Sequence, residues 1–229
     1  MALMPHFSAG PRSGGLFGSE HRLFTHAVQF YSDPGFLVRV LSGLVRSAFW
    51  AGDGVLLLAT PEHRESLARQ VRNEGCDLDA QRTKGCYAVM DPGEVLPRCS
   101  AGGKLDLSSL MELFRESVTR VAGASDRRPA RVFVFGELVA VLSAQGNMEA
   151  ALLVEGVWDG LVHRLPLSVL CAYPVDQFQA AGTEEFFLQI CAAHSTLVPP
   201  DDYPTPESAK RILRAMAGRQ SQTPSGGSQ

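Results

Sequence analysis

The sequence predicts an α/β domain in three layers, with a mostly parallel sheet that carries helices on both faces. Short apolar segments of strand length alternate along the chain with longer segments whose apolar residues recur at helical spacing. One strand segment, 55–59, is apolar at every position, which is typical of a strand buried on both faces. Strands separated by helices of this length are joined by crossover connections, which place the strands parallel.

The first half of the domain is expected to hold two strand–helix pairs. Residues 27–31 form a short strand, and Ser32-Asp33-Pro34 supplies an N-cap and a proline suited to the first turn of a helix that ends near Trp50. Asp53-Gly54 turns the chain into the buried strand 55–59. Thr60-Pro61 then starts a second helix, which ends near Gly75.

The second half continues the alternation of strands and helices. The expected strands are a weaker one at 86–90, a buried one at 131–135 and one at 168–173. The expected helices are an amphipathic helix over 107–121, a helix capped by Asn147 that reaches Leu165, and a last core helix from the cap Thr183 to near Thr196. This order gives five strands in a mostly parallel sheet.

The composition suits one soluble globular domain. The chain has 229 residues, of which 45% are hydrophobic, and a net charge of −3. It contains no run of eighteen apolar residues and its first 25 residues lack an apolar signal region, so we expect a cytoplasmic protein without a membrane segment. The five cysteines have no C-x-x-C spacing, which predicts reduced thiols. Without Lys/Arg blocks, direct nucleic-acid binding is not expected.

Both ends of the chain differ in composition from the predicted domain. Residues 1–22 are rich in Gly and Pro and are expected to be disordered, so the domain spans 23–198. The tail 199–229 contains a predicted short basic helix at 206–218. That helix either packs on the domain or docks on a partner.

The first strand–helix junction lacks the features of a phosphate-binding loop. It reads Tyr31-Ser-Asp-Pro-Gly-Phe36, with one glycine, an acidic residue and no lysine. Gly103-Lys104 lacks the hydroxyl residue after the lysine and the glycine five residues before it. ATP hydrolysis is therefore not expected.

Five short islands of polar and aromatic residues stand out, and all but the last fall where a predicted strand ends. They are His26-x-x-Gln29-Phe30-Tyr31, Ala59-Thr60-Pro61-x-His63, Phe135-Gly136-Glu137, Cys171-Ala172-Tyr173-Pro174 and Cys191-x-x-His194-Ser195. In open parallel sheets, ligands bind in the crevice outside the carboxyl ends of the strands. The islands therefore predict a binding site at that crevice.

These islands, together with Gly146-Asn147 and the pair Glu155 and Trp158, occur in an order that resembles the MEDS family of sensory domains over residues 24–198. The resemblance implies a KaiC/RecA-like fold that has lost its phosphate-binding loop. It also implies a sensor of small hydrocarbon derivatives, of a kind often fused to histidine kinase or DNA-binding modules. This chain carries no such output module in its sequence.

The resemblance places nine side chains at the pocket: His26, Gln29, Tyr31, His63, Glu137, Cys171, Tyr173, Cys191 and His194. Several also have a purely structural interpretation. The two tyrosines can be aromatic residues at strand ends, and His63 can face solvent at a helix start. A carboxylate such as Glu137 is costly after an apolar strand unless it is paired or exposed, whereas Cys171 can simply fill the core.

Cys191 and His194 raise the alternative of a metal site. They lie three residues apart on the predicted last helix, so they would share a face. Cys171 and His26 could complete a tetrahedral set. The spacing alone is not diagnostic, because only one such pair is present, and no cofactor is expected.

The expected function is that of a non-enzymatic sensor that binds a small organic ligand and signals through a partner such as a histidine kinase or transcription regulator. The sequence also leaves open that the protein forms a homo-oligomer. A ligand of about two to four heavy atoms gains at most roughly 3–6 kcal/mol, so high concentration, a metal or a thiolate would have to help. Two alternatives remain. One is a cysteine enzyme that uses Cys171 or Cys191 with a histidine base and Glu137. The other is a ligand-free interaction module with a degenerate nucleotide site.

Overall fold

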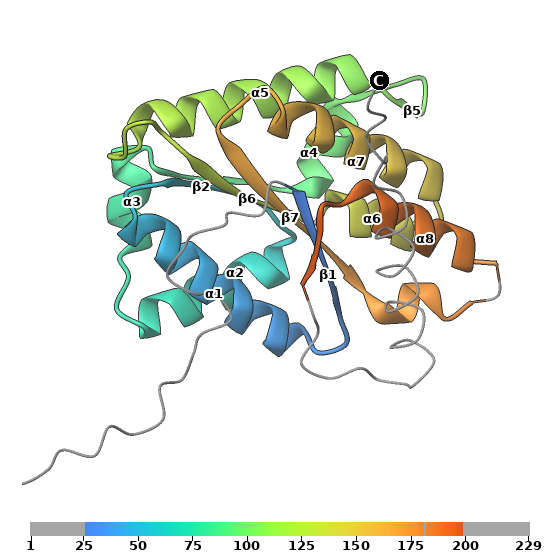
Figure 1. Ribbon diagram of the computed structural model, residues 1–229, viewed down its shortest axis with the longest axis horizontal. Helices are drawn as coiled ribbons and strands as arrows, with labels where there is room; N and C mark the ends of the chain where they lie inside the picture. Colours follow the sequence, from blue (N-terminus) through green and yellow to red (C-terminus); the bar gives the residue numbers. More distant parts are fainter. Residues whose placement is uncertain (1–25, 181, 199–229) are drawn as a thin grey trace, which may run out of the picture.

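A six-stranded parallel sheet in the order β3-β2-β6-β7-β1-β8 forms the centre of the domain, in a computed structural model that describes residues 26–180 and 182–198 (Figure 1). The strands are β1 His26–Tyr31, β2 Gly54–Leu58, β3 Tyr87–Met90, β6 Val132–Gly136, β7 Leu167–Pro174 and β8 Thr196–Val198. Every pairing within this sheet is parallel. The predicted α/β class is confirmed.

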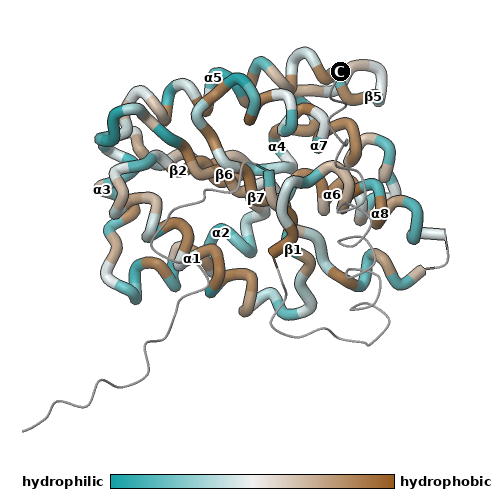
Figure 2. Tube along the Cα trace, viewed as in Figure 1, coloured by the Kyte–Doolittle hydropathy of each residue, from teal (hydrophilic) through white to brown (hydrophobic). Residues whose placement is uncertain are grey.

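Helices cover both faces of the sheet. They are α1 Pro34–Trp50, α2 Pro61–Asn73, α3 Leu78–Lys84, α4 Pro92–Arg98, α5 Leu107–Ala124, α6 Leu138–Ala144, α7 Met148–Val162 and α8 Glu184–Ala193, with a short 3-10 helix η1 Val175–Phe178 after β7. The buried residues of α1, α2 and α3 share one core, and those of α4 to α8 share the other. Figure 2 shows the central strands as largely hydrophobic segments between these layers.

The helix starts follow the local sequence. The Asp33 side chain accepts hydrogen bonds from the backbone N–H groups of Gly35 and Phe36, and Pro34 opens α1. Asn147 caps α7 in the same way by accepting from Ala150 N–H. These two predicted caps are confirmed, whereas Thr183 occupies the N-cap position of α8 without a side-chain capping bond.

The last core helix is shorter than predicted. It ends at Ala193, not near Thr196, and His194 is its C-cap in an extended conformation with φ −111° and ψ 140°. Ser195 then donates hydrogen bonds from its backbone N–H and its hydroxyl to the His26 carbonyl. These bonds lead the chain into β8, which pairs with β1 and was not predicted. A strand of three residues is too short to show a period in the sequence.

Short elements account for the other differences. The helices α3, α4 and α6 each have seven residues, and β4 Ser100–Ala101 pairs with β5 Lys104–Leu105 in a two-stranded antiparallel sheet. None of these was predicted, because each is too brief for a recognisable pattern. The predicted disorder at 1–22 and the predicted basic helix at 206–218 lie outside the described residues. Within the described part of the chain, no helix has the length and apolar character needed to cross a membrane.

Candidate functional site

The alternation of side chains along β1 divides the predicted site residues between the two faces of the sheet. Val28 and Phe30 belong to the core under α4 to α8, whereas Ala27 and Tyr31 belong to the core under α1 to α3. Since successive strand residues point to opposite faces, His26 lies with the first set and Gln29 with the second. The nine predicted residues therefore do not line one common crevice.

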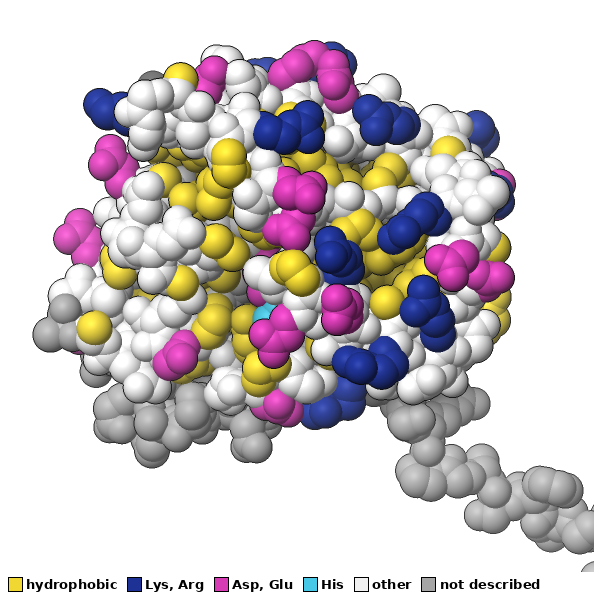
Figure 3. Space-filling view, turned by 180° about the vertical axis from the view of Figure 1, so that it is seen from behind, with side chains coloured by type: hydrophobic (Ala, Val, Ile, Leu, Met, Phe, Trp, Pro, Cys, Tyr) yellow, Lys and Arg dark blue, Asp and Glu magenta, His cyan; other side chains and the backbone are white. Residues whose placement is uncertain are grey.

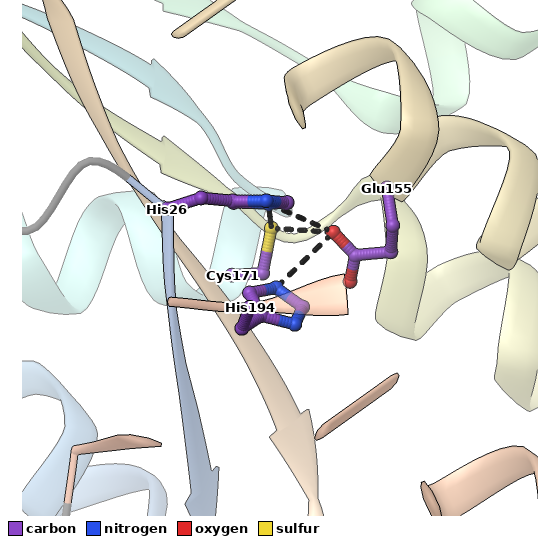
Figure 4. A group of neighbouring side chains, drawn as sticks. All are labelled: His26, Glu155, Cys171 and His194. Carbon is purple, nitrogen blue, oxygen red and sulfur yellow. Dashed lines mark hydrogen bonds and ion pairs between the residues drawn. The ribbon is translucent and has the colours of Figure 1, made fainter. Parts of the chain in front are cut away.

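Four side chains meet in the interior of the domain and are called the buried quartet: His26, Glu155, Cys171 and His194 (Figure 4). They come from the start of β1, the middle of α7, the middle of β7 and the C-cap of α8. None is more than 2% exposed. Each of the four residues offers one ligand atom, and these four atoms all lie within 4.8 Å of one another.

The quartet converges on one oxygen atom of Glu155. Glu155 Oε2 lies 3.1 Å from Cys171 Sγ, 3.2 Å from His26 Nε2 and 3.3 Å from His194 Nε2. The sulfur of Cys171 is also 3.7 Å from His26 Nε2. The other carboxylate oxygen, Oε1, accepts a hydrogen bond of 2.7 Å from the Tyr173 hydroxyl.

Burial and charge set the protonation of these groups. Burial alone would raise the pKa of Glu155, but the charges and hydrogen bonds of His194 and His26 outweigh it and hold that pKa below its ordinary value. Burial and then the Glu155 charge raise the pKa values of the Cys171 thiol and the Tyr173 hydroxyl well above their ordinary values. In the metal-free protein, Glu155 is therefore ionised and these two neighbours keep their protons.

Helix α7 brings Glu155 to this place through its packing on the sheet. Trp158 lies one turn further along the same face and stacks on Phe114 of α5, with ring centroids 4.2 Å apart and planes 5° apart. Gly136 makes room, because a β-carbon there would lie 3.3 Å from the Trp158 indole nitrogen and 3.7 Å from the Cys171 sulfur. The bare backbone at the end of β6 lets the helix approach the thiol.

An aromatic cluster lies beside the quartet on the same face of the sheet. Its members are Phe30, Tyr173, Phe178, Phe186 and Phe187, with neighbouring ring centroids 4.8 to 6.4 Å apart. They come from the final residues of β1 and β7, from η1 and from α8. Tyr173 belongs to both groups, since its ring packs in the cluster and its hydroxyl reaches the quartet.

On the opposite face, Tyr31, His63 and Glu137 form a second group at the carboxyl ends of β1, β2 and β6. His63 Nδ1 lies 2.5 Å from Glu137 Oε1, and Glu137 Oε2 accepts from both the backbone N–H and the hydroxyl of Thr60. The Tyr31 ring stands edge-on to His63, with centroids 6.0 Å apart. Burial and then the Glu137 charge raise the pKa of Tyr31. His63 is thus held by Glu137 and does not simply face solvent.

The bond to Glu137 is expected to hold the His63 imidazole protonated above its ordinary pKa of about 6.5. Because this pKa is higher in the folded than in the unfolded protein, the His63–Glu137 pair stabilises the fold fully below about pH 6.5. Its contribution to stability is lost as the pH rises through the pKa of His63 in the folded protein. An NMR titration should show the raised pKa of His63 falling in Glu137→Gln.

The neighbouring acid Glu62 acts on His63 only through its charge, so Glu62→Gln is the matched control and should shift the pKa of His63 much less. Equal shifts in the two variants would contradict the role of the Glu137 hydrogen bond.

Two predicted residues stand apart from both groups. Gln29 is buried, and neither of its amide atoms has a hydrogen-bond partner among the residues that the structure describes. Cys191 is buried on α8 in the core under α4 to α8, outside the quartet. His194 is the extended C-cap of α8 and not a residue within the helix, so Cys191 and His194 do not form the i, i+3 pair on one helix that the metal alternative assumed.

Glu155 is the functional candidate that the sequence did not single out as a site residue. Its signal was an acidic residue among the apolar residues of a predicted helix, since buried carboxylates need partners. Those partners come from residues 26, 171 and 194, and only the folded chain shows them together.

A separate surface groove of about 410 Å³ lies along α2 and α3, and none of the predicted site residues lines it. Four of its side chains are arginines: Arg64, Arg69, Arg72 and Arg82. In Figure 3, basic side chains surround a hollow on the right of the molecule, the side on which α3 lies in that view. Acidic residues partly neutralise the groove, since Arg72 and Arg64 pair with Asp79 and Asp91.

A comparison with known protein families gives one match. The family model described as "MEDS: MEthanogen/methylotroph, DcmR Sensory domain" matches residues 25–194. This range contains both groups of site residues described above. A search of curated proteins found no match.

Proposed function

The chain belongs to the MEDS family of sensory domains, and from this membership we propose that it senses a small organic molecule, a hydrocarbon derivative, and passes the signal to a protein partner. The family itself establishes the sensory role. The nature of the ligand, its position and the route of the signal are our proposal.

We place the ligand where the aromatic cluster meets the buried quartet. The observation that carries this assignment is the position of Tyr173, whose ring packs against Phe30 and Phe178 while its hydroxyl donates to Glu155. A small organic molecule needs an apolar wall and a few fixed polar groups, and this junction has both. It lies near the carboxyl ends of β1 and β7, where open parallel sheets bind ligands.

Polar groups at this junction would select the ligand. Apolar contacts discriminate poorly between molecules that differ by one methylene, whereas a site that hydrogen-bonds a ligand strongly rejects analogues without the required group. We therefore expect the site to bind short alcohols, diols or haloalkanes more tightly than alkanes of the same size.

Helix α8 is the element through which binding would act. It carries Phe186 and Phe187 into the aromatic cluster and ends at His194 in the quartet. If the domain binds the ligand more tightly with α8 in one position than in another, the ligand shifts the population of molecules towards the tighter-binding position. The strand β8 follows directly, so the signal would leave through the C-terminal part of the chain to a histidine kinase or transcription regulator in the cytoplasm.

We propose that the site does not catalyse a reaction. The Cys171 side chain has no exposed surface, and its thiol donates to Glu155. A catalytic thiolate needs the opposite setting, partly exposed and next to positive charge. Buried tyrosine and cysteine donors on one carboxylate instead suit recognition.

Loss of the Tyr173 hydroxyl is expected to weaken ligand binding about 5- to 150-fold, since a site missing one buried hydrogen bond loses about 1–3 kcal/mol. Trp158 lies one helical turn from Glu155, and the other tryptophan, Trp50, is 92% exposed. In a Trp50→Phe background, Trp158 fluorescence therefore reports on the site. Titration with one- to four-carbon alcohols, diols and haloalkanes gives dissociation constants for this background and for Tyr173→Phe added to it.

Tyr87→Phe is the matched control for this titration. Tyr87 is also buried, but it lies on β3 at the far edge of the sheet and in the opposite core. It should leave binding unchanged. Equal affinity in Tyr173→Phe and Tyr87→Phe, or no saturable response to any compound, would refute the assigned site.

A further inference from the structure

We propose that the buried quartet is a tetrahedral site for a divalent transition metal, and that Zn²⁺ fits it best. The inference rests on four side chains, His26, Glu155, Cys171 and His194, and does not depend on the identity of the organic ligand. Two imidazoles, a thiolate and a carboxylate are all ligands that Zn²⁺ takes in proteins.

Four of the six distances between the donor atoms are close to the edges of such a tetrahedron, and the other two are no longer than 4.8 Å. Zinc bonds of about 2.0–2.3 Å place tetrahedral ligands about 3.3–3.7 Å from one another. The measured edges are 3.1, 3.2 and 3.3 Å from Glu155 Oε2 to Cys171 Sγ, His26 Nε2 and His194 Nε2, and 3.7 Å from Cys171 Sγ to His26 Nε2. Four donors from distant parts of the chain are already gathered around one point (Figure 4).

The hydrogen bond of His194 directs the correct nitrogen atom to that point. Its Nδ1 lies 2.7 Å from the Ile190 carbonyl oxygen, which can only accept, so Nδ1 carries a proton. In the neutral ring, Nε2 then presents its lone pair towards Glu155 Oε2 at 3.3 Å. A metal ion at the centre of the quartet would take the place of the contact between these two atoms. Metal-binding histidines usually donate their other N–H to a carbonyl in this way.

The carboxylate is positioned by an outer contact of the same kind. Tyr173 donates to Oε1 of Glu155, which leaves Oε2 directed at the centre of the quartet. Ligating carboxylates in proteins are commonly held by such hydrogen bonds. The outer contacts of the site are thus present on both His194 and Glu155.

Charge balance also favours the metal. A Zn²⁺ ion with one thiolate, one carboxylate and two neutral imidazoles has no net charge, which suits a site that is closed to solvent. Binding would release to solvent the thiol proton of Cys171 and any proton on Nε2 of His26 or His194, because the ligands are the thiolate and the neutral imidazoles. With four protein ligands, the site is of the closed, structural kind.

Such a metal would join parts of the chain that are far apart in sequence. His26 begins β1, Cys171 lies on β7, Glu155 lies on α7 and His194 ends α8. The metal would fix the end of α8 to the sheet. Chelation should therefore lower the melting temperature and loosen α8 before the rest of the domain.

The test is metal analysis of the full chain. Protein expressed in zinc-supplemented medium and passed through gel filtration should contain about one zinc per chain by elemental analysis. Cys171→Ser should lose most of this zinc. Cys86→Ser is the matched control, because Cys86 is also buried but donates its thiol to the Ala124 carbonyl, a bond that serine can keep.

A second measurement needs no variant to fold. Wild-type protein unfolded with chelator and refolded with Co²⁺ should show a thiolate-to-cobalt charge-transfer band and the intense visible bands of tetrahedral cobalt. X-ray absorption should give one sulfur and three nitrogen or oxygen ligands. Wild-type protein that holds neither zinc nor cobalt, or zinc retained in full by Cys171→Ser, would overturn the proposal. Zinc loss in Cys86→Ser to the same degree would do so as well.

Discussion

Replacing Glu155 with alanine is expected to lower the free energy of unfolding by about 3–5 kcal/mol, the range seen when one member of a buried charged pair is removed. Glu155 has no exposed surface, and its carboxylate is the shared partner of Cys171, Tyr173 and two histidines. Alanine would leave these groups buried without their acceptor. Urea denaturation gives the free energy, with an unchanged slope if the denatured state is unaffected.

The control for this substitution lies on the same helix. Asp159 is exposed on α7, and Asp159→Ala should change stability by less than about 0.5 kcal/mol. Combining Glu155→Ala with Tyr173→Phe should cost less than the sum of the single changes, because both remove the same hydrogen bond. Additive effects, or a loss as small as that of Asp159→Ala, would show that the carboxylate does not hold the quartet together.

Replacing Trp158 with alanine is expected to cost about 3–5 kcal/mol of stability, the usual loss for a large aromatic residue in a core. Its side chain is fully buried, and its ring stacks on Phe114 where α7 meets α5. The cavity would lie one helical turn from Glu155, so the quartet should loosen too. Calorimetry and urea denaturation measure the loss of stability.

Trp50 provides the matched control, because it is the other tryptophan of the chain and is 92% exposed at the end of α1. Trp50→Ala should leave stability nearly unchanged. Similar losses at both positions would contradict the packing described for α7.

Much of the fold was predictable from the sequence, because its signals are local. The all-apolar segment 55–59 predicted a strand buried on both faces, and the structure has the fully buried β2 there, between β3 and β6. The caps Asp33 and Asn147 marked the starts of α1 and α7 correctly. What was missed was short, above all β8, whose three residues are held by pairing with β1.

The candidate site was less predictable. His26, Cys171 and His194 stood in motifs, but their motifs gave no information about which face of the sheet each would occupy. The strand period of two sends His26 and Tyr31 to opposite faces, which divides one expected crevice into two groups. Cys191 looked like the partner of His194 only while both were assigned to one helix.

By itself, the sequence determined the fold class, the absence of a phosphate-binding-loop motif at the first strand–helix junction and the resemblance to a sensory family, since each depends on short local patterns that can be recognised along the chain. Only the tertiary structure decided that Glu155 lies at the centre of the buried quartet. The physical reason is that a buried carboxylate is stable only among donors, and here those donors, at positions 26, 171, 173 and 194, come together only when β1, β7, α7 and α8 pack.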